Sequence, residues 1–329
     1  MAARKPKRGL VLGAGGVLGA AWSVGALCAL EEVCGFDPRD ADVIIGTSAG
    51  SVLGALVAGG VSPRQLRDHQ LGIPVTEGPL SGFSWDYERA TSQRPGRPKF
   101  FAKGSGLLLK SSARKLRQMP PTAVLSGLLP QGSGSLARIG HLVEAITPMG
   151  EWSPHKNLWI CAMNYQSGTR VAFGRPGSPT AELAQAVQAS CAIPAWFKPV
   201  EIGGEMYVDG GACSATSVDL LAKMGLDEVY VIAPMVSFAM DRPEHVIAKL
   251  ERRWRVQVTK RCLREVEKVR ENGADVVVLG PGPEDLEAIG ANLMDVSRRI
   301  NVLETSLETS VEALRDPDHV GPDHLADVG

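Results

Sequence analysis

The chain reads Asp42-Val43-Ile44-Ile45-Gly46-Thr47-Ser48-Ala49-Gly50 where a short apolar segment gives way to small residues. The segment 42–45 is β-branched and apolar, which predicts a buried parallel strand. The small and apolar residues from 51 to 58 predict a closely packed helix. Gly46 and Gly50 flank Ser48 and permit the strained backbone of a sharp turn that points a hydroxyl outward. The sequence therefore predicts a strand, a turn carrying a nucleophilic serine, and a helix.

A glycine cluster lies upstream, in Gly13-Ala14-Gly15-Gly16-Val17-Leu18-Gly19. It follows an apolar run at 9–12 and precedes an apolar helix that extends to about Glu32, so its backbone N–H groups are predicted to form an oxyanion pocket. The uncharged run 9–30 follows a basic segment and would pass a hydropathy test for a signal peptide or a membrane helix. Its early glycines instead favour a strand, a turn and a helix. We therefore expect no cleaved signal peptide and a cytoplasmic location.

The remaining pattern alternates strands and helices, which predicts an α/β fold with a mostly parallel central sheet between helices. Further strands are predicted at 158–163, 170–173, 206–208, 229–232 and 275–279, and further helices at 63–70, 180–190 and 244–271. We expect one domain over 1–315 and a polar, disordered tail over 316–329. The C-terminal helices are expected to cover the sheet or to form a homodimer contact.

Composition excludes several classes of protein. The net charge of −1 argues against general nucleic-acid binding. The six cysteines include no Cys-x-x-Cys pair, which favours reduced thiols over a disulfide framework or a zinc site.

An insertion is predicted over about 73–140, and the segment 89–143 has an unusual composition. It contains no acidic residue and ten basic ones, interleaved with leucines and phenylalanines. Such a segment favours a lid or an arm that binds an anionic membrane surface. The alternative is a solvated helical insertion whose leucines pack on the core, with one short helix near 111–118.

A nucleophilic serine needs a general base, which is most often histidine. None of the six histidines follows a strand in a glycine-rich setting, and His319 and His324 lie in the polar tail. Asp209 ends the predicted strand 206–208 and precedes Gly210 and Gly211. An aspartate at a sheet edge takes a hydroxyl proton directly if burial raises its pKa. Asp209 is therefore the preferred candidate, with a simple turn cap as the alternative.

Four motifs in this order resemble the patatin-like phospholipase family. They are the glycine cluster after strand 9–12, Gly46-Thr47-Ser48-Ala49-Gly50, the segment 190–200 with sequence SCAIPAWFKPV, and Asp209-Gly210-Gly211. The resemblance covers about residues 8–235. It implies a lipid acyl hydrolase with Ser48 as nucleophile, Asp209 as base, the N–H groups of Gly15 and Gly16 as oxyanion hole, and no cofactor or metal.

The chain departs from the family pattern at several positions. Leu18 stands where the family usually has a basic residue, and Ala14 where it has a glycine. After Asp-Gly-Gly, Ala215 and Ser217 stand where asparagine and proline are common. These changes motivate a second hypothesis, a catalytically inactive lipid-binding or scaffolding protein of the same fold.

A third hypothesis interprets Gly13-Ala14-Gly15 as a dinucleotide-binding turn, with Asp37, Asp40 or Asp42 on the ribose. Leu18 occupies the position of the last glycine of that motif, and the hypothesis leaves Ser48 and Asp209 unexplained.

Overall fold

The structure is a computed structural model that describes residues 4–85, 108, 121–129 and 132–316. The predicted helix near 111–118, most of the segment 89–143 and nearly all of the C-terminal tail lie outside these residues. The division into one domain over 1–315 stays a prediction.

A single sheet of eight strands organises the described residues, in the order β5-β6-β3-β2-β1-β7-β8, with β4 paired to β3. The parallel strands are β1 (Arg8–Leu12), β2 (Val43–Thr47), β3 (Leu158–Asn164), β7 (Glu228–Ile232) and β8 (Asp275–Leu279). The antiparallel strands are β4 (Arg170–Phe173), β5 (Val200–Ile202) and β6 (Glu205–Asp209). The predicted mixed α/β fold with a mostly parallel sheet is confirmed; β5 was not predicted as a strand.

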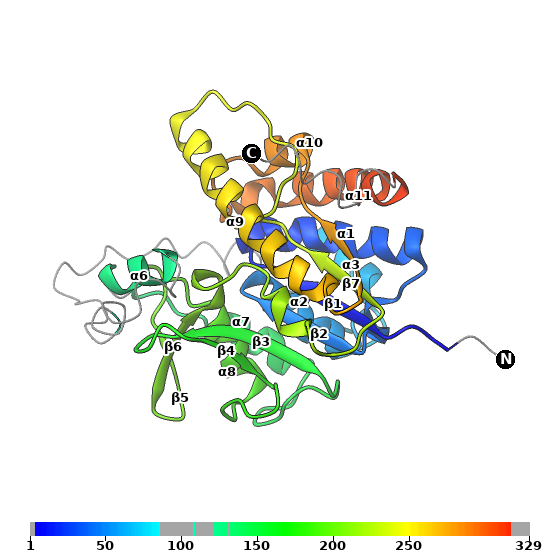
Figure 1. The fold of residues 1–329 in the computed structure, drawn as a ribbon. Coiled ribbons are helices and arrows are strands. Elements are labelled where there is room, and N and C mark those ends of the chain that lie inside the picture. Colours follow the sequence, from blue (N-terminus) through cyan, green and yellow to red (C-terminus); the bar gives the residue numbers. More distant parts are fainter. Residues whose placement is uncertain (1–3, 86–107, 109–120, 130–131, 317–329) are drawn as a thin grey trace.

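Helices cover both faces of the sheet (Figure 1). One face packs against helices α1, α2 and α8, whose bounds are Gly16–Cys34, Ala49–Ala58 and Leu183–Ser190, and α11 (Arg299–Arg315) packs on the outer side of α1. The other packs mainly against the second half of α9 (Val246–Arg270). Alternate residues of β1 serve the two layers, with Leu10 and Leu12 in one and Val11 in the other. Among the described residues, the remaining α-helices are α3 (Pro63–Leu71), α6 (Pro121–Leu128), α7 (Ala137–Glu144) and α10 (Pro283–Ile289).

Helix α1 explains the apolar run near the N-terminus. It is long and apolar enough to cross a membrane by length and composition, but 61% of its most apolar window is buried inside this structure. A Cβ built on Gly25 would lie 2.6 Å from the Ser306 Oγ of α11, and that hydroxyl donates a hydrogen bond to the Trp22 carbonyl at 2.7 Å. The apolar run is therefore a core helix with α11 packed against it.

All six cysteines are free in this structure, and four of them are buried, namely Cys161, Cys191, Cys213 and Cys262.

Candidate active site

Ser48 occupies a strained turn between β2 and α2. Its backbone has φ 53° and ψ −122°, a left-handed conformation that non-glycine residues rarely adopt. A Cβ built on Gly46 would lie 2.6 Å from the Gly50 carbonyl oxygen, and one built on Gly50 would lie 2.1 Å from that of Leu12. Both glycines are therefore sterically required, because the start of α2 crosses directly over the end of β1.

Hydrogen bonds from α8 and α2 hold the Ser48 backbone in place. The Ser48 N–H donates to the Ser190 Oγ at 2.8 Å, and that hydroxyl donates to the Cys161 carbonyl at 2.6 Å. The Ser48 carbonyl accepts from the Ser51 hydroxyl at 2.6 Å and from the Cys191 thiol at 3.3 Å. The sequence pattern predicted no role for Ser190 or Cys191, although both residues lie in the motif 190–200. These bonds stabilise the strained turn.

Asp209 ends β6, and its side chain is buried beside Ser48. Its Oδ1 accepts from the Gly211 N–H at 2.7 Å. Burial raises the pKa of Asp209 from 3.8 to about 6, and the neighbouring Ser48 hydroxyl and the Gly211 N–H offset part of this rise. A carboxylate with such a pKa is ionised at neutral pH and still accepts a proton more readily than an exposed aspartate.

The register of β3 explains why these two residues meet. Cys161 pairs with Thr47 of β2, and the next residue, Ala162, pairs with Asp209 of β6. Strand β4 pairs with residues 160–163 and so occupies the opposite edge of β3. β2 and β6 therefore lie end to end along one edge of β3, and the residue after β2 faces the last residue of β6.

The glycine cluster contacts both of these loops. Gly13 donates to the Ile232 carbonyl at 2.9 Å and Ala14 to the Ala215 carbonyl at 2.8 Å, which ties the cluster to the sheet. A Cβ built on Gly50 would lie 2.7 Å from the Gly13 carbonyl oxygen, and one on Gly211 would lie 3.4 Å from the Ala14 Cβ. Gly15 and Gly16 begin α1, and their N–H groups have no acceptor among the residues that the structure describes. Two backbone donors are therefore available beside the Ser48 and Asp209 loops.

The departures from the family pattern have structural counterparts. Leu18 is fully buried, and its N–H donates to the Leu293 carbonyl at 3.0 Å. Ala215 contributes its carbonyl to Ala14, a bond that does not depend on the side chain. Ser217 adopts φ 59° and is buried.

The loop after Gly211 is anchored to α9. The hydroxyls of Ser214 and Thr216 donate to Glu265 at 2.8 and 3.1 Å. These bonds orient the aspartate loop in a chain that lacks the asparagine and proline.

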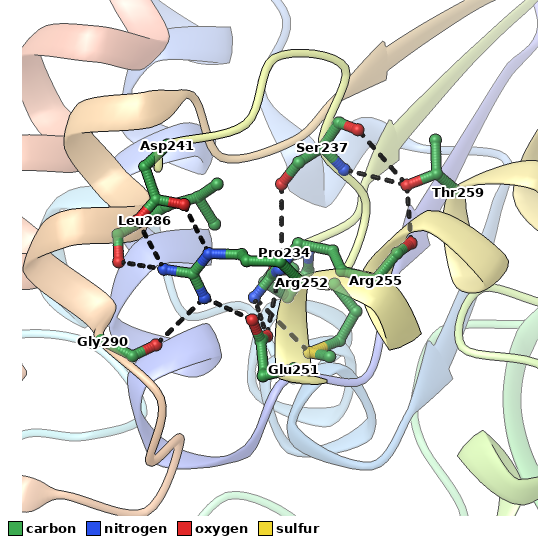
Figure 2. Close-up of polar contacts among 10 residues, drawn as sticks. Pro234, Ser237, Asp241, Glu251, Arg252, Arg255, Thr259, Leu286 and Gly290 are labelled. Atoms are coloured by element: carbon green, nitrogen blue, oxygen red, sulfur yellow. Dashed lines mark hydrogen bonds and ion pairs between the residues drawn. The ribbon is translucent and has the colours of Figure 1, made fainter. Parts of the chain in front are cut away.

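A second group of contacts supports the glycine cluster from α9 (Figure 2). A Cβ built on Gly15 would lie 2.6 Å from the Pro234 ring, so this ring packs directly on the cluster. The Pro234 carbonyl accepts from the Arg255 Nη1 at 2.5 Å, and Arg255 forms an ion pair with Glu251 at 2.9 Å. Arg255 is fully buried, so it positions Pro234, and through it Gly15, without reaching the site.

Histidine plays no visible part in this arrangement. His155 Nε2 lies 2.7 Å from the Ala41 carbonyl oxygen, and His141 contacts Glu144 at 3.1 Å. His319 and His324 lie outside the described residues. Asp209 is therefore the acidic or basic group that the described structure brings to Ser48.

Comparison with known protein families gives a match over the part of the chain that contains Ser48 and Asp209. The model of the family described as Patatin-like phospholipase matches residues 10–222, well over half of the chain. The chain belongs to the patatin-like phospholipase family. The family is one of lipid ester hydrolases, so membership supports this class of activity for the chain. The match includes the glycine cluster, Ser48 and Asp209, whereas α9, α10 and α11 follow it.

Solved structures of two bacterial proteins are similar to this patatin-like chain. VipD from Legionella pneumophila matches with a TM-score of 0.41 and 14% identity, over 95% of this chain and 67% of that chain. The chain of the ExoU-SpcU complex from Pseudomonas aeruginosa matches with a TM-score of 0.33 and 20% identity, over 94% of this chain and 53% of that chain. The patatin-like chain therefore spans about two thirds of the first and half of the second.

Proposed function

We propose that this patatin-like protein hydrolyses lipid carboxylic esters through an acyl-Ser48 intermediate, with Asp209 as general base. The observation that carries the proposal is the buried Asp209 carboxylate, which the strand register brings beside the strained Ser48 turn and whose pKa burial raises to about 6. As the Ser48 Oγ attacks the ester carbonyl carbon, its proton passes to Asp209. The N–H groups of Gly15 and Gly16 stabilise the oxyanion that forms.

Collapse of this intermediate breaks the ester bond, and the departing alkoxide takes the proton from Asp209. Water then attacks the acyl carbon, again with Asp209 as proton acceptor, and the proton returns to Ser48 Oγ as the fatty acid leaves. A phospholipid, a lysophospholipid or a neutral lipid satisfies this chemistry. We further propose a cytoplasmic protein that meets its lipid at a membrane surface through the basic segment 89–143.

The test is hydrolysis of p-nitrophenyl esters of increasing acyl length and of a fluorogenic phospholipid. The wild type is compared with Ser48→Ala, with Asp209→Asn, and with Ser81→Ala, which removes an exposed hydroxyl elsewhere. We expect both site variants to lose several orders of magnitude in kcat and the control to keep it. A fluorophosphonate should label the wild type and the control but not Ser48→Ala.

The competing hypothesis is a lipid-binding or scaffolding protein without activity, motivated by the changes at Leu18, Ala215 and Ser217. A folded wild type that neither reacts with the fluorophosphonate nor hydrolyses any ester would favour it and refute the proposed activity.

A further inference from the structure

The first half of α9 has its apolar side facing solvent. Val246, Ile247, Leu250 and Trp254 are exposed to 79%, 74%, 67% and 44%. These positions share one side of a helix, because residues three and four apart are neighbours on its surface. The other large apolar side chains exposed among the described residues, Ile73, Leu125 and Met149, are far apart in the sequence. We refer to the four α9 residues as the apolar stripe.

The opposite side of the same turns carries two arginines and is buried (Figure 2). Arg252 and Arg255 are buried there with Thr259. Arg252 forms an ion pair with Asp241 at 2.6 Å and donates to the Leu286 carbonyl at 2.8 Å. A helix on a protein surface normally packs its apolar side inward and leaves its charges in water. These turns instead bury two arginines and expose four apolar side chains, so packing among the residues that the structure describes does not account for the apolar stripe.

The charges beside the stripe indicate its partner. Lys249 and Arg253 are exposed next to it, whereas Glu251 is paired with Arg252 and Arg255. Over the whole helix, nine Lys and Arg residues stand against three Glu. An apolar stripe that includes a tryptophan and has basic neighbours is typical of a helix that lies in the surface of an anionic membrane. A symmetric contact between two copies would bring the same basic residues together, which disfavours self-association.

We propose that the apolar stripe of α9 docks the protein on an anionic lipid surface, an inference that rests on the proposed action on lipid esters. The four apolar side chains enter the interface, and Lys249 and Arg253 bind lipid phosphates or carboxylates. The same helix holds Pro234 against Gly15 through Arg255, so the docking surface and the glycine cluster belong to one packed unit. In the sequence, α9 lies more than 100 residues after the basic segment 89–143.

The test measures vesicle binding by the full chain carrying Ser48→Ala, so that binding is independent of turnover. Sedimentation uses phosphatidylcholine vesicles with and without phosphatidylserine. The double variant Leu250→Glu/Trp254→Glu should bind phosphatidylserine vesicles at least about tenfold more weakly, since two apolar side chains are withheld from lipid. Met149→Glu adds one such negative charge at an exposed apolar residue elsewhere and should leave binding unchanged. Lys249→Glu/Arg253→Glu should abolish the preference for phosphatidylserine.

Two controls separate the outcomes. All α9 variants alter exposed residues, so with Ser48 present they should keep wild-type hydrolysis of a short soluble ester. If that ester is not hydrolysed but vesicle binding depends on the stripe, docking stands and the proposed activity fails. Equal binding by the double variant and Met149→Glu would overturn the docking proposal. The proposal would also be overturned if the wild type bound no vesicles and instead formed a dimer, and if Leu250→Glu/Trp254→Glu dissociated that dimer.

Discussion

The substitution Asp209→Asn should abolish hydrolysis and at the same time stabilise the folded protein. The rise of the Asp209 pKa from 3.8 to about 6 means that the folded protein disfavours the charged carboxylate by about 3 kcal/mol. Asparagine has nearly the same shape, retains an oxygen that accepts from the Gly211 N–H, and carries no charge. At pH 8, where aspartate is ionised in both the folded and unfolded states, the variant should therefore gain up to about 3 kcal/mol in free energy of unfolding.

The stability difference between Asp209→Asn and the wild type should change with pH in a definite direction. Because the folded-state pKa of Asp209 is the higher one, the contribution of this group to stability is fully present below about pH 4 and is lost as the pH rises through 6. The advantage of Asp209→Asn should therefore shrink to about 1 kcal/mol at pH 4.5. Urea unfolding of both proteins at pH 8 and pH 4.5 measures the difference directly.

Asp219 provides a control of opposite sign. Burial acts to raise its pKa, but the hydrogen bonds and charge of Arg170, at 2.7 and 2.8 Å, lower it overall. Asp219→Asn should therefore destabilise the protein at pH 8. The reasoning about Asp209 is refuted if Asp209→Asn is less stable than the wild type at pH 8, or if its advantage is equal at the two pH values.

Three further predictions concern the same site. The kcat/KM for a short soluble ester should fall about tenfold between pH 7 and pH 5, because Asp209 must be ionised to accept the proton. A stopped assay that measures the released acid checks this, and a kcat/KM that does not change with pH would exclude Asp209 as the base. Ser190→Ala should lower the free energy of unfolding by about 2 kcal/mol or more, because it leaves the Ser48 N–H and the Cys161 carbonyl buried without their partner. An unchanged midpoint of urea unfolding would show that these two hydrogen bonds are dispensable. Arg255→Met should destabilise the protein by about 3 kcal/mol, because Glu251 and the Pro234 carbonyl lose a buried partner. It should also lower kcat for the soluble ester more than it raises KM. A variant with the stability and kcat of the wild type would show that Arg255 is not a positioning residue.

The local structure around Ser48 was predictable from sequence. A β-branched apolar segment followed by Gly46, Ser48 and Gly50 permits few conformations, and the close contacts at both glycines show the steric reason. Asp209 was predictable as a candidate for a similar reason, since it ends a strand just before two glycines. Its pKa near 6 was not, because it depends on the neighbours that bury it.

Other features depend on contacts between distant segments. The meeting of Ser48 with Asp209 follows from the pairing of two consecutive β3 residues with β2 and β6, and a strand's own sequence does not specify its register against two partners. Ser190 and Pro234 are not distinguished by local pattern either, because their roles arise from residues far along the chain.

Helix α9 shows the limit of pattern reasoning most clearly. Its sequence predicted a helix that covers the sheet or forms a homodimer contact, and the second half packs on the sheet through Cys262, Val266 and Val269. Because Arg252 and Arg255 find carboxylate and carbonyl partners in the interior, their charges are compensated there and the apolar stripe is left outside. The sequence by itself thus determined the helix and the turn at Ser48, whereas the partners available in the folded chain decided which side of α9 is buried and which carboxylate reaches the serine.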